Sequence, residues 1–141
     1  MTTSTVQPTA EQLTAAIKSV LPDANAAWVY GSAASGSMNS ESDIDIAVLL
    51  PPKGARQTSW SLRQQAQSLG ERWQIKVDLV NFSNVSCVLQ KEILQAGKRL
   101  FSNDELAVGN AELQALSQYR DFNERNAKEF ARIARTGKVY A

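Results

Sequence analysis

Apolar residues recur at intervals of three and four in several segments of the chain, which is the spacing of one face of an α-helix. The first segment begins at Thr9, which forms a T-x-x-Q capping box with Gln12, and it ends at Pro22. Its apolar positions are Leu13, Ala16, Ile17, Val20 and Leu21. The same spacing predicts three further helices, over residues 59–73, 85–97 and 104–135.

Glycines mark expected ends and a possible bend in the last two of these helices. We expect Gly97 to end the third helix in a left-handed cap, and Gly137 lies beyond the end of the fourth. Gly109 and residues 119–122 are positions at which the fourth helix could bend or break. The large apolar residues of this helix fall near one side: Leu106, Leu113, Leu116, Phe122, Phe130 and Ile133.

Two largely apolar runs, residues 26–30 and 44–50, predict buried strands. Residues 75–80, "IKVDLV", instead alternate with the period of a strand. One face then carries Ile75, Val77 and Leu79, and the other carries Lys76, Asp78 and Val80. Residues 98–102 add a short edge strand to this prediction.

The composition is that of one ordinary globular domain. The chain has 141 residues, 43% of them hydrophobic, and its 15 Lys+Arg nearly balance 14 Asp+Glu. A field of basic charge is absent, so we expect no direct binding of nucleic acid. The N-terminus lacks the features of a signal peptide, no apolar run is long enough to span a membrane, and Cys87 has no disulfide partner. We therefore expect a cytoplasmic protein.

Two aspartates interrupt the second apolar run at its start. Residues two apart on a strand face the same way, with Cα atoms roughly 6.6 Å apart, so Asp43 and Asp45 share a face. Asp78 could sit beside Asp45 if their strands are neighbours. Three carboxylates in that arrangement could hold two Mg²⁺ ions about 3.5–4 Å apart, as in two-metal phosphoryl-transfer sites. The chain has no histidine, which argues against a zinc site.

A Gly-Ser pair follows the first predicted strand. Gly31 has no side chain, so its backbone can approach a phosphate closely, and Ser32 can donate hydrogen bonds from its hydroxyl and amide. A triphosphate could then lie between this loop and the carboxylates.

Each of these features also has a purely structural interpretation. A Gly-Ser turn is common, and a D-x-D pair at a strand end is more often a solvated turn or a cap than a metal site. Asp78 could be an exposed acid on an edge strand. The three tryptophans, Trp28, Trp60 and Trp73, are expected to be core or groove-lining residues, and Cys87 a small buried hydrophobe. The combination of strand, Gly-Ser, D-x-D and third acid favours the metal site.

These residues resemble the signature of the polymerase beta-like nucleotidyltransferase superfamily, which is G-S, about ten residues, D-x-D, and a third acid on a following strand. The short chain and its ending, "YRDFNERNAKEFARIARTGKVYA", resemble the minimal nucleotidyltransferase (MNT) antitoxins of HEPN/MNT toxin–antitoxin pairs. The resemblance implies an α/β (α+β) fold with a small mixed β-sheet backed by helices. We expect a single domain over residues 1–141, with its core at about 9–102 and a C-terminal helical segment at about 103–137.

The resemblance also implies an activity. A type VII-like antitoxin of this kind transfers AMP from ATP to a tyrosine hydroxyl of a HEPN ribonuclease toxin, with which it forms a hetero-oligomer, and uses two Mg²⁺ ions. Asp43 and Asp45 would bind both metals, and Asp78 would bind the metal that activates the acceptor and take its proton. Gly31, Ser32 and Ser42 would hold the nucleotide.

One segment departs from the family pattern. Many relatives carry arginine in the loop after Gly-Ser, whereas this chain has Ala33, Ala34 and Ser35, which lack a phosphate contact of that kind. This departure gives weight to one alternative, an antitoxin that inhibits its toxin by binding alone. The shared motif leaves a second alternative, ranked last, which is a nucleotidyltransferase that modifies a small molecule.

Overall fold

The computed structural model describes residues 8–31, 43–52 and 59–137, and within them four strands form one mixed sheet with the order β3-β2-β1-β4. The central strands β1 and β2 are antiparallel, β4 pairs antiparallel with β1, and β3 pairs parallel with β2. The strands are β1 (Ala26–Tyr30), β2 (Ile44–Leu49), β3 (Val77–Asn81) and β4 (Lys98–Ser102). The expected small mixed sheet backed by helices is confirmed.

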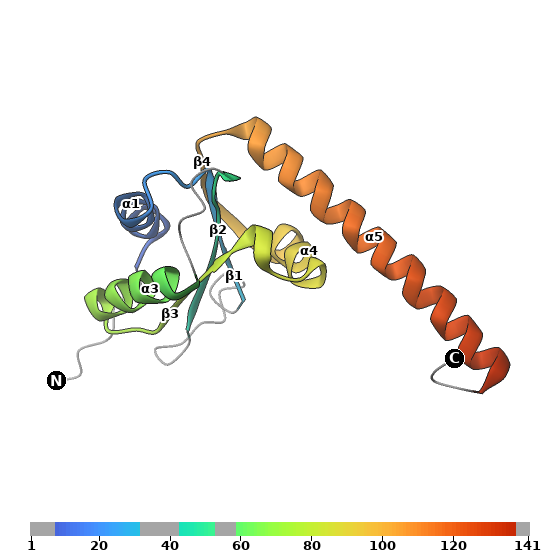
Figure 1. The fold of residues 1–141 in the computed structure, drawn as a ribbon. Helices are drawn as coiled ribbons and strands as arrows, with labels where there is room; N and C mark the ends of the chain where they lie inside the picture. The colour runs from blue at the N-terminus through green and yellow to red at the C-terminus, as the bar shows by residue number, and fades with distance from the viewer. Residues whose placement is uncertain (1–7, 32–42, 53–58, 138–141) are drawn as a thin grey trace.

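Helices cover both faces of this sheet (Figure 1). Helices α1 (Ala10–Val20) and α3 (Ser59–Trp73) pack on one face, and α4 (Cys87–Ala96) with the first turns of α5 (Glu105–Thr136) packs on the other. A 3₁₀ turn, η2 (Phe82–Asn84), joins β3 to α4. Because both faces are covered, every residue of β1 is buried, which explains its continuous apolar sequence.

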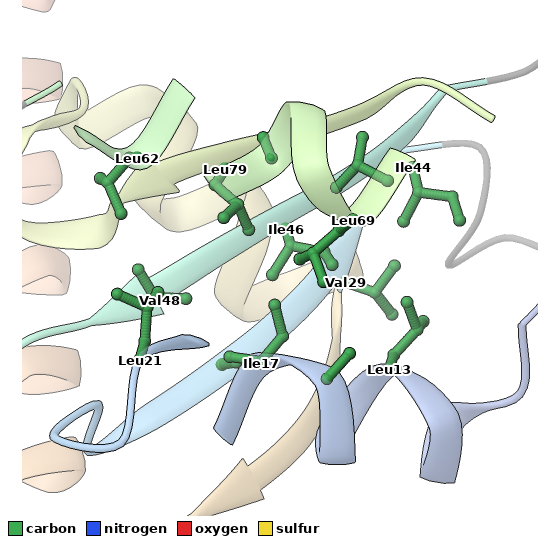
Figure 2. Packing of buried hydrophobic residues seen from close by; sticks show 14 of the residues in the cluster. Leu13, Ile17, Leu21, Val29, Ile44, Ile46, Val48, Leu62, Leu69 and Leu79 are labelled. Atoms are coloured by element: carbon green, nitrogen blue, oxygen red, sulfur yellow. The ribbon is translucent and has the colours of Figure 1, made fainter. Parts of the chain in front are cut away.

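The larger of two apolar clusters lies between the sheet and the pair α1 and α3. Figure 2 shows Leu13 and Ile17 of α1 on one side of Val29 and Ile46, with Leu69 of α3 packed against the same strands. The second cluster lies under α4 and α5, and Trp28 and Phe82 contribute its aromatic pair with ring centroids 4.9 Å apart. Alternate residues of each central strand therefore serve different cores.

Local signals at the helix ends agree with the structure at two positions. Thr9 and Gln12 form the complete capping box, with the Gln12 amide donating to Thr9 Oγ1 at 3.1 Å and the Thr9 amide donating to Gln12 Oε1 at 2.9 Å. Gly137 adopts the left-handed conformation, φ 71°, and its amide donates to the Ile133 carbonyl at 2.6 Å. Both helix ends thus follow from local sequence.

Gly97 was expected in a left-handed cap, and this expectation is wrong. Its backbone is extended, with φ −74°. A Cβ at this position would lie 2.4 Å from the Ile93 carbonyl oxygen and 3.1 Å from that of Val29. Glycine is needed here because two chain segments approach closely, not because the chain turns left-handed.

Two element boundaries also differ from the expected ones. The strand expected from residue 75 begins at Val77, because Gln74 has a positive φ of 56° and the Ile75 amide donates to the Gly70 carbonyl. The helix expected from residue 85 begins at Cys87, because Ser86 caps it by accepting from the Leu89 amide at 3.2 Å. Ile75, Val77 and Leu79 nevertheless share the apolar face that was expected of them.

Helix α5 is continuous from Glu105 to Thr136, without a break at Gly109 or in residues 119–122. At 1.5 Å per residue, its 32 residues span about 48 Å. Its buried residues are the small Val108 and Ala115, and Figure 1 shows the C-terminal part continuing beyond the sheet and the other helices. Four of its large apolar residues are exposed: Leu106, Leu113, Leu116 and Phe130.

The predictions for isolated aromatic and sulfur side chains had mixed outcomes. Trp28 is buried and Trp73 packs partly buried on the larger cluster, as expected, but Trp60 is 64% exposed and belongs to neither core. Cys87 is only partly buried. No helix within the described ranges is both long and apolar enough to cross a membrane.

Candidate active site

Strand pairing brings the motif residues to one end of the sheet, where β1 ends and β2 and β3 begin. Asp45 pairs with Tyr30, the last residue of β1, and on its other side with Asp78 of β3. Asp43 directly precedes β2, and Gly31 directly follows β1. The structure therefore brings Gly31 and the three aspartates together. Ser32 and Ser42 lie outside the described residues, as does the loop segment 33–35.

Gly31 and Asp45 are in close contact. Gly31 has a positive φ of 72°, and a Cβ placed on it would lie 2.8 Å from Asp45 Oδ2. Both facts require glycine, because an L-residue is strained in this conformation and a side chain would displace the carboxylate. The glycine of the Gly-Ser pair thus lets the turn after β1 approach the central aspartate.

The electrostatic environment of Asp45 is set by burial and by like charges. Burial raises the pKa of the Asp45 carboxyl, and the negative charges of Asp78 and Asp43 raise it further, whereas Lys76 lowers it. Lys76 Nζ lies 3.8 Å from Asp43 Oδ2 in an exposed ion pair, which is weak in water. The protein alone therefore leaves the carboxylates of this site in net repulsion.

Tyr30 is a member of this site that the sequence analysis missed. Burial raises the pKa of its hydroxyl to about 12, and the charges of Asp45, Asp78 and Glu92 contribute in the same direction. The phenol therefore remains protonated at physiological pH and can act as a hydrogen-bond donor. Its position before Gly31 was visible in the sequence, but its place opposite Asp45 depends on the antiparallel register.

The three carboxylates fit a divalent cation by their chemistry. Across the described part of the chain, no group of three or more His, Cys, Asp or Glu side chains is placed closely enough to hold a metal ion as it stands. However, the raised pKa of Asp45 shows that these carboxylates interact, and a divalent cation between them would relieve their repulsion. Oxygen donors of this type, with no nitrogen or sulfur, suit Mg²⁺.

The position of Asp78 is compatible with both interpretations considered for it. It lies on the edge strand of the sheet and is exposed, as the structural interpretation held, and it also pairs with Asp45, as a shared site requires. The site is consequently asymmetric, with the turn after β1 on one side of Asp45 and the free edge of the sheet on the other.

The segment that carries these residues matches a known protein family. Residues 11–106 match the model of the family described as polymerase beta, nucleotidyltransferase. The chain belongs to this nucleotidyltransferase family. Its motif residues Gly31, Asp43, Asp45 and Asp78 all lie within the matched segment.

Individual relatives of this nucleotidyltransferase are toxin–antitoxin components. The protein adenylyltransferase MntA of Shewanella oneidensis is 32% identical over 85 residues, which span 60% of this chain and 59% of MntA. A crystal structure of a toxin–antitoxin with AMP-PNP contains a chain of similar fold, with a TM-score of 0.73 and 22% identity over 89% of this chain and 98% of that one. A second structure, of a tri-AMPylated S. oneidensis HEPN toxin in complex with MNT antitoxin, also contains a chain of similar fold. The TM-score is 0.69, and the identity is 21% over 89% of this chain and 95% of that one.

Proposed function

We propose that this protein is the antitoxin of a HEPN toxin–antitoxin pair and that it inactivates its toxin by transferring AMP from ATP to a tyrosine hydroxyl. The assembly of Asp43, Asp45 and Asp78 at the exposed end of a nucleotidyltransferase sheet carries this proposal. The similar proteins support a protein acceptor, since MntA is a protein adenylyltransferase and a chain of similar fold occurs in a complex with an AMPylated HEPN toxin.

The residues divide between nucleotide and acceptor. Gly31, with Ser32 and Ser42, would hold the triphosphate through main-chain amides and hydroxyls. Asp43 and Asp45 would hold two Mg²⁺ ions, and Asp78 would share the ion beside the acceptor. The bound metal would supply charge that stabilises the transferring phosphoryl group and the leaving pyrophosphate. The acceptor tyrosine oxygen forms a bond to the α-phosphorus, the bond from that phosphorus to the pyrophosphate oxygen breaks, and Asp78 takes the phenolic proton.

Two features of the structure support a protein acceptor. Asp78 is exposed on an edge strand, so a folded partner can reach it. Helix α5 also exposes large apolar side chains, with Leu106 75%, Leu113 69% and Phe130 70% accessible. These side chains offer apolar contacts to a protein partner. A cytoplasmic location is part of the proposal, because ATP and a ribonuclease toxin act there.

The experiment combines the purified protein with ATP, Mg²⁺ and the HEPN toxin of the proposed pair, and then removes the antitoxin. We expect the toxin to remain inactive as a ribonuclease and to carry one or more added AMP masses on tyrosine. A toxin whose acceptor tyrosine is replaced by phenylalanine should gain no mass and recover its activity. Full recovery of the wild-type toxin with no added mass would instead identify an antitoxin that acts by binding alone.

Small-molecule transfer is tested in the same assay. Labelled AMP that appears on a hydroxyl compound while the toxin stays unmodified would overturn the proposed acceptor. The Asp45→Asn variant serves as the inactive control for both reactions.

A further inference from the structure

The outer edge of β3 is open in the described part of the structure. The sheet order places β3 at one end, with β2 as its only strand neighbour among the described residues. The Ile44 amide donates to the Lys76 carbonyl at 2.9 Å. In a parallel pair, the residues of a strand alternate in the direction of their main-chain groups. The main chain of Asp78 therefore faces β2, and the amide and carbonyl of Leu79 face outward.

Two hollows follow this open edge and meet at Asp78. The first, of about 550 Å³, lies between α3 and the start of β3 and is lined by Arg63, Gln67 and Gly70 on the helix side. The second, of about 250 Å³, continues along the strand to Asn81. Arg63 and Asp78 line both hollows. Together they form a groove that runs beside the strand and has the proposed acceptor-side carboxylate at its middle.

We propose that the acceptor segment of the partner protein docks in this groove as an extended strand added to the edge of β3. The inference rests on the proposed function and specifies how that site receives its substrate. An added strand would pair with the outward main-chain groups of β3, which is a common way to bind an extended peptide. Unpaired strand edges favour an occupant with a free main chain rather than a small molecule.

The geometry of an added strand explains how the acceptor hydroxyl reaches the site. A residue opposite Asp78 on the new strand would point to the same face of the sheet, with the two Cβ atoms about 4.5–5.5 Å apart. Its tyrosine ring could then extend along Asp78 towards Asp45. The next residues of the added strand would point to the opposite face, where the hollow beside α3 offers space for a side chain. The triphosphate would remain on the Gly31 side of Asp45, away from the added strand.

A pair of tryptophan variants on α3 tests the groove. Gln67 is exposed and lines the larger hollow, so Gln67→Trp fills it. Gln64 is exposed on the same helix and lines neither hollow, so Gln64→Trp is the matched control. We expect Gln67→Trp to lower kcat/KM for AMP transfer to the toxin by at least tenfold through a higher KM, with unchanged ATP binding and thermal unfolding. Gln64→Trp should behave as wild type.

Amide hydrogen exchange provides a readout that does not depend on transfer. Binding of the tyrosine-to-phenylalanine toxin should slow exchange of the Leu79 amide, because that amide would donate to the added strand. Protection of Leu79 without any AMP transfer by the wild-type protein would support the docking mode and overturn the proposed reaction. Transfer that proceeds with Leu79 unprotected and with Gln67→Trp fully active would overturn the docking mode alone. Protection of Leu79 by ATP without toxin would assign the groove to the nucleotide and overturn the inference.

Discussion

Asp45 of β2 and Asp78 of β3 stand directly opposite each other in the parallel pairing of their strands. Asp45 belongs to a central strand and is partly buried, whereas Asp78 belongs to the edge strand and is exposed. After burial, the negative charge of Asp78 makes the largest contribution to the raised pKa of Asp45, ahead of the charge of Asp43. In the proposed function, this unequal pair divides the site into a nucleotide side, next to Gly31, and an acceptor side at the edge of the sheet.

Replacing Asp45 by asparagine should abolish AMP transfer and leave the fold intact. The change removes a metal ligand, and loss of one group that stabilises transition-state charge costs about 10²–10³ in rate. Without metal, the thermal unfolding midpoint should stay equal or rise, since the change also removes repulsion with Asp43 and Asp78. Transfer rates and unfolding midpoints measure the two effects, with Asp23→Asn, an exposed acid in a turn, as control. Near-wild-type transfer would contradict the metal site.

The contribution of Asp45 to the stability of the metal-free protein should fall as the pH rises through the carboxyl range. The pKa of Asp45 is raised in the folded state, so folding favours its protonated form. This contribution is fully present below the unfolded-state pKa and is lost as the pH rises through the higher folded-state pKa. The wild-type minus Asp45→Asn difference in unfolding free energy, measured from pH 3 to pH 7 without metal, should show this decline. A difference that does not vary with pH would contradict the shift.

The motif residues could be predicted from sequence because local patterns determine their positions. A strand, a glycine turn and a second strand with D-x-D define Gly31, Asp43 and Asp45, and the period of residues 59–73 gave the bounds of α3. Asp78 could be placed on a strand, but only the sheet order shows that its strand is both a neighbour of β2 and an edge. The acceptor side of the site is therefore a property of topology.

Features that depend on tertiary contacts could not be predicted from the sequence. Tyr30 looked like an ordinary core residue until the antiparallel register placed it opposite Asp45. Gly97 does cap α4, but its backbone is extended, and the close approach of the Ile93 and Val29 carbonyls accounts for the glycine. The period of α5 predicted an apolar side made of its large apolar residues, but the structure buries Val108 and Ala115 instead. Periodicity shows which residues share a face but not whether anything covers that face.

Replacing Gly31 by alanine should damage both stability and transfer. A non-glycine residue in a strained conformation costs about 1–3 kcal/mol, and here the added Cβ would also meet Asp45 Oδ2. The control is Gly109→Ala in α5, where nothing lies within 4 Å of an added Cβ and the change should stabilise the helix by about 0.5–1 kcal/mol. Denaturant unfolding measures the stability of both variants, and the AMP-transfer assay measures the activity of Gly31→Ala. An unchanged Gly31→Ala protein would show that the close contact with Asp45 is not required.

Replacing Asp78 by asparagine should separate chemistry from nucleotide binding. In the proposed site Asp78 takes the acceptor proton, and it lies on the side of Asp45 away from Gly31. Asparagine keeps the shape of the side chain but cannot accept a proton, so the single-turnover rate should fall by about 10²–10⁴, the usual contribution of a general base. The dissociation constant for ATP should change by less than about threefold, because the triphosphate contacts lie on the Gly31 side of Asp45.

Equilibrium ATP binding and single-turnover transfer to the toxin are measured side by side for Asp78→Asn. Asp45→Asn is the contrasting variant, which should weaken metal-dependent binding as well. Equal losses of binding and rate in Asp78→Asn would move Asp78 to the nucleotide side, and the open edge of β3 would then lose its role in presenting the acceptor.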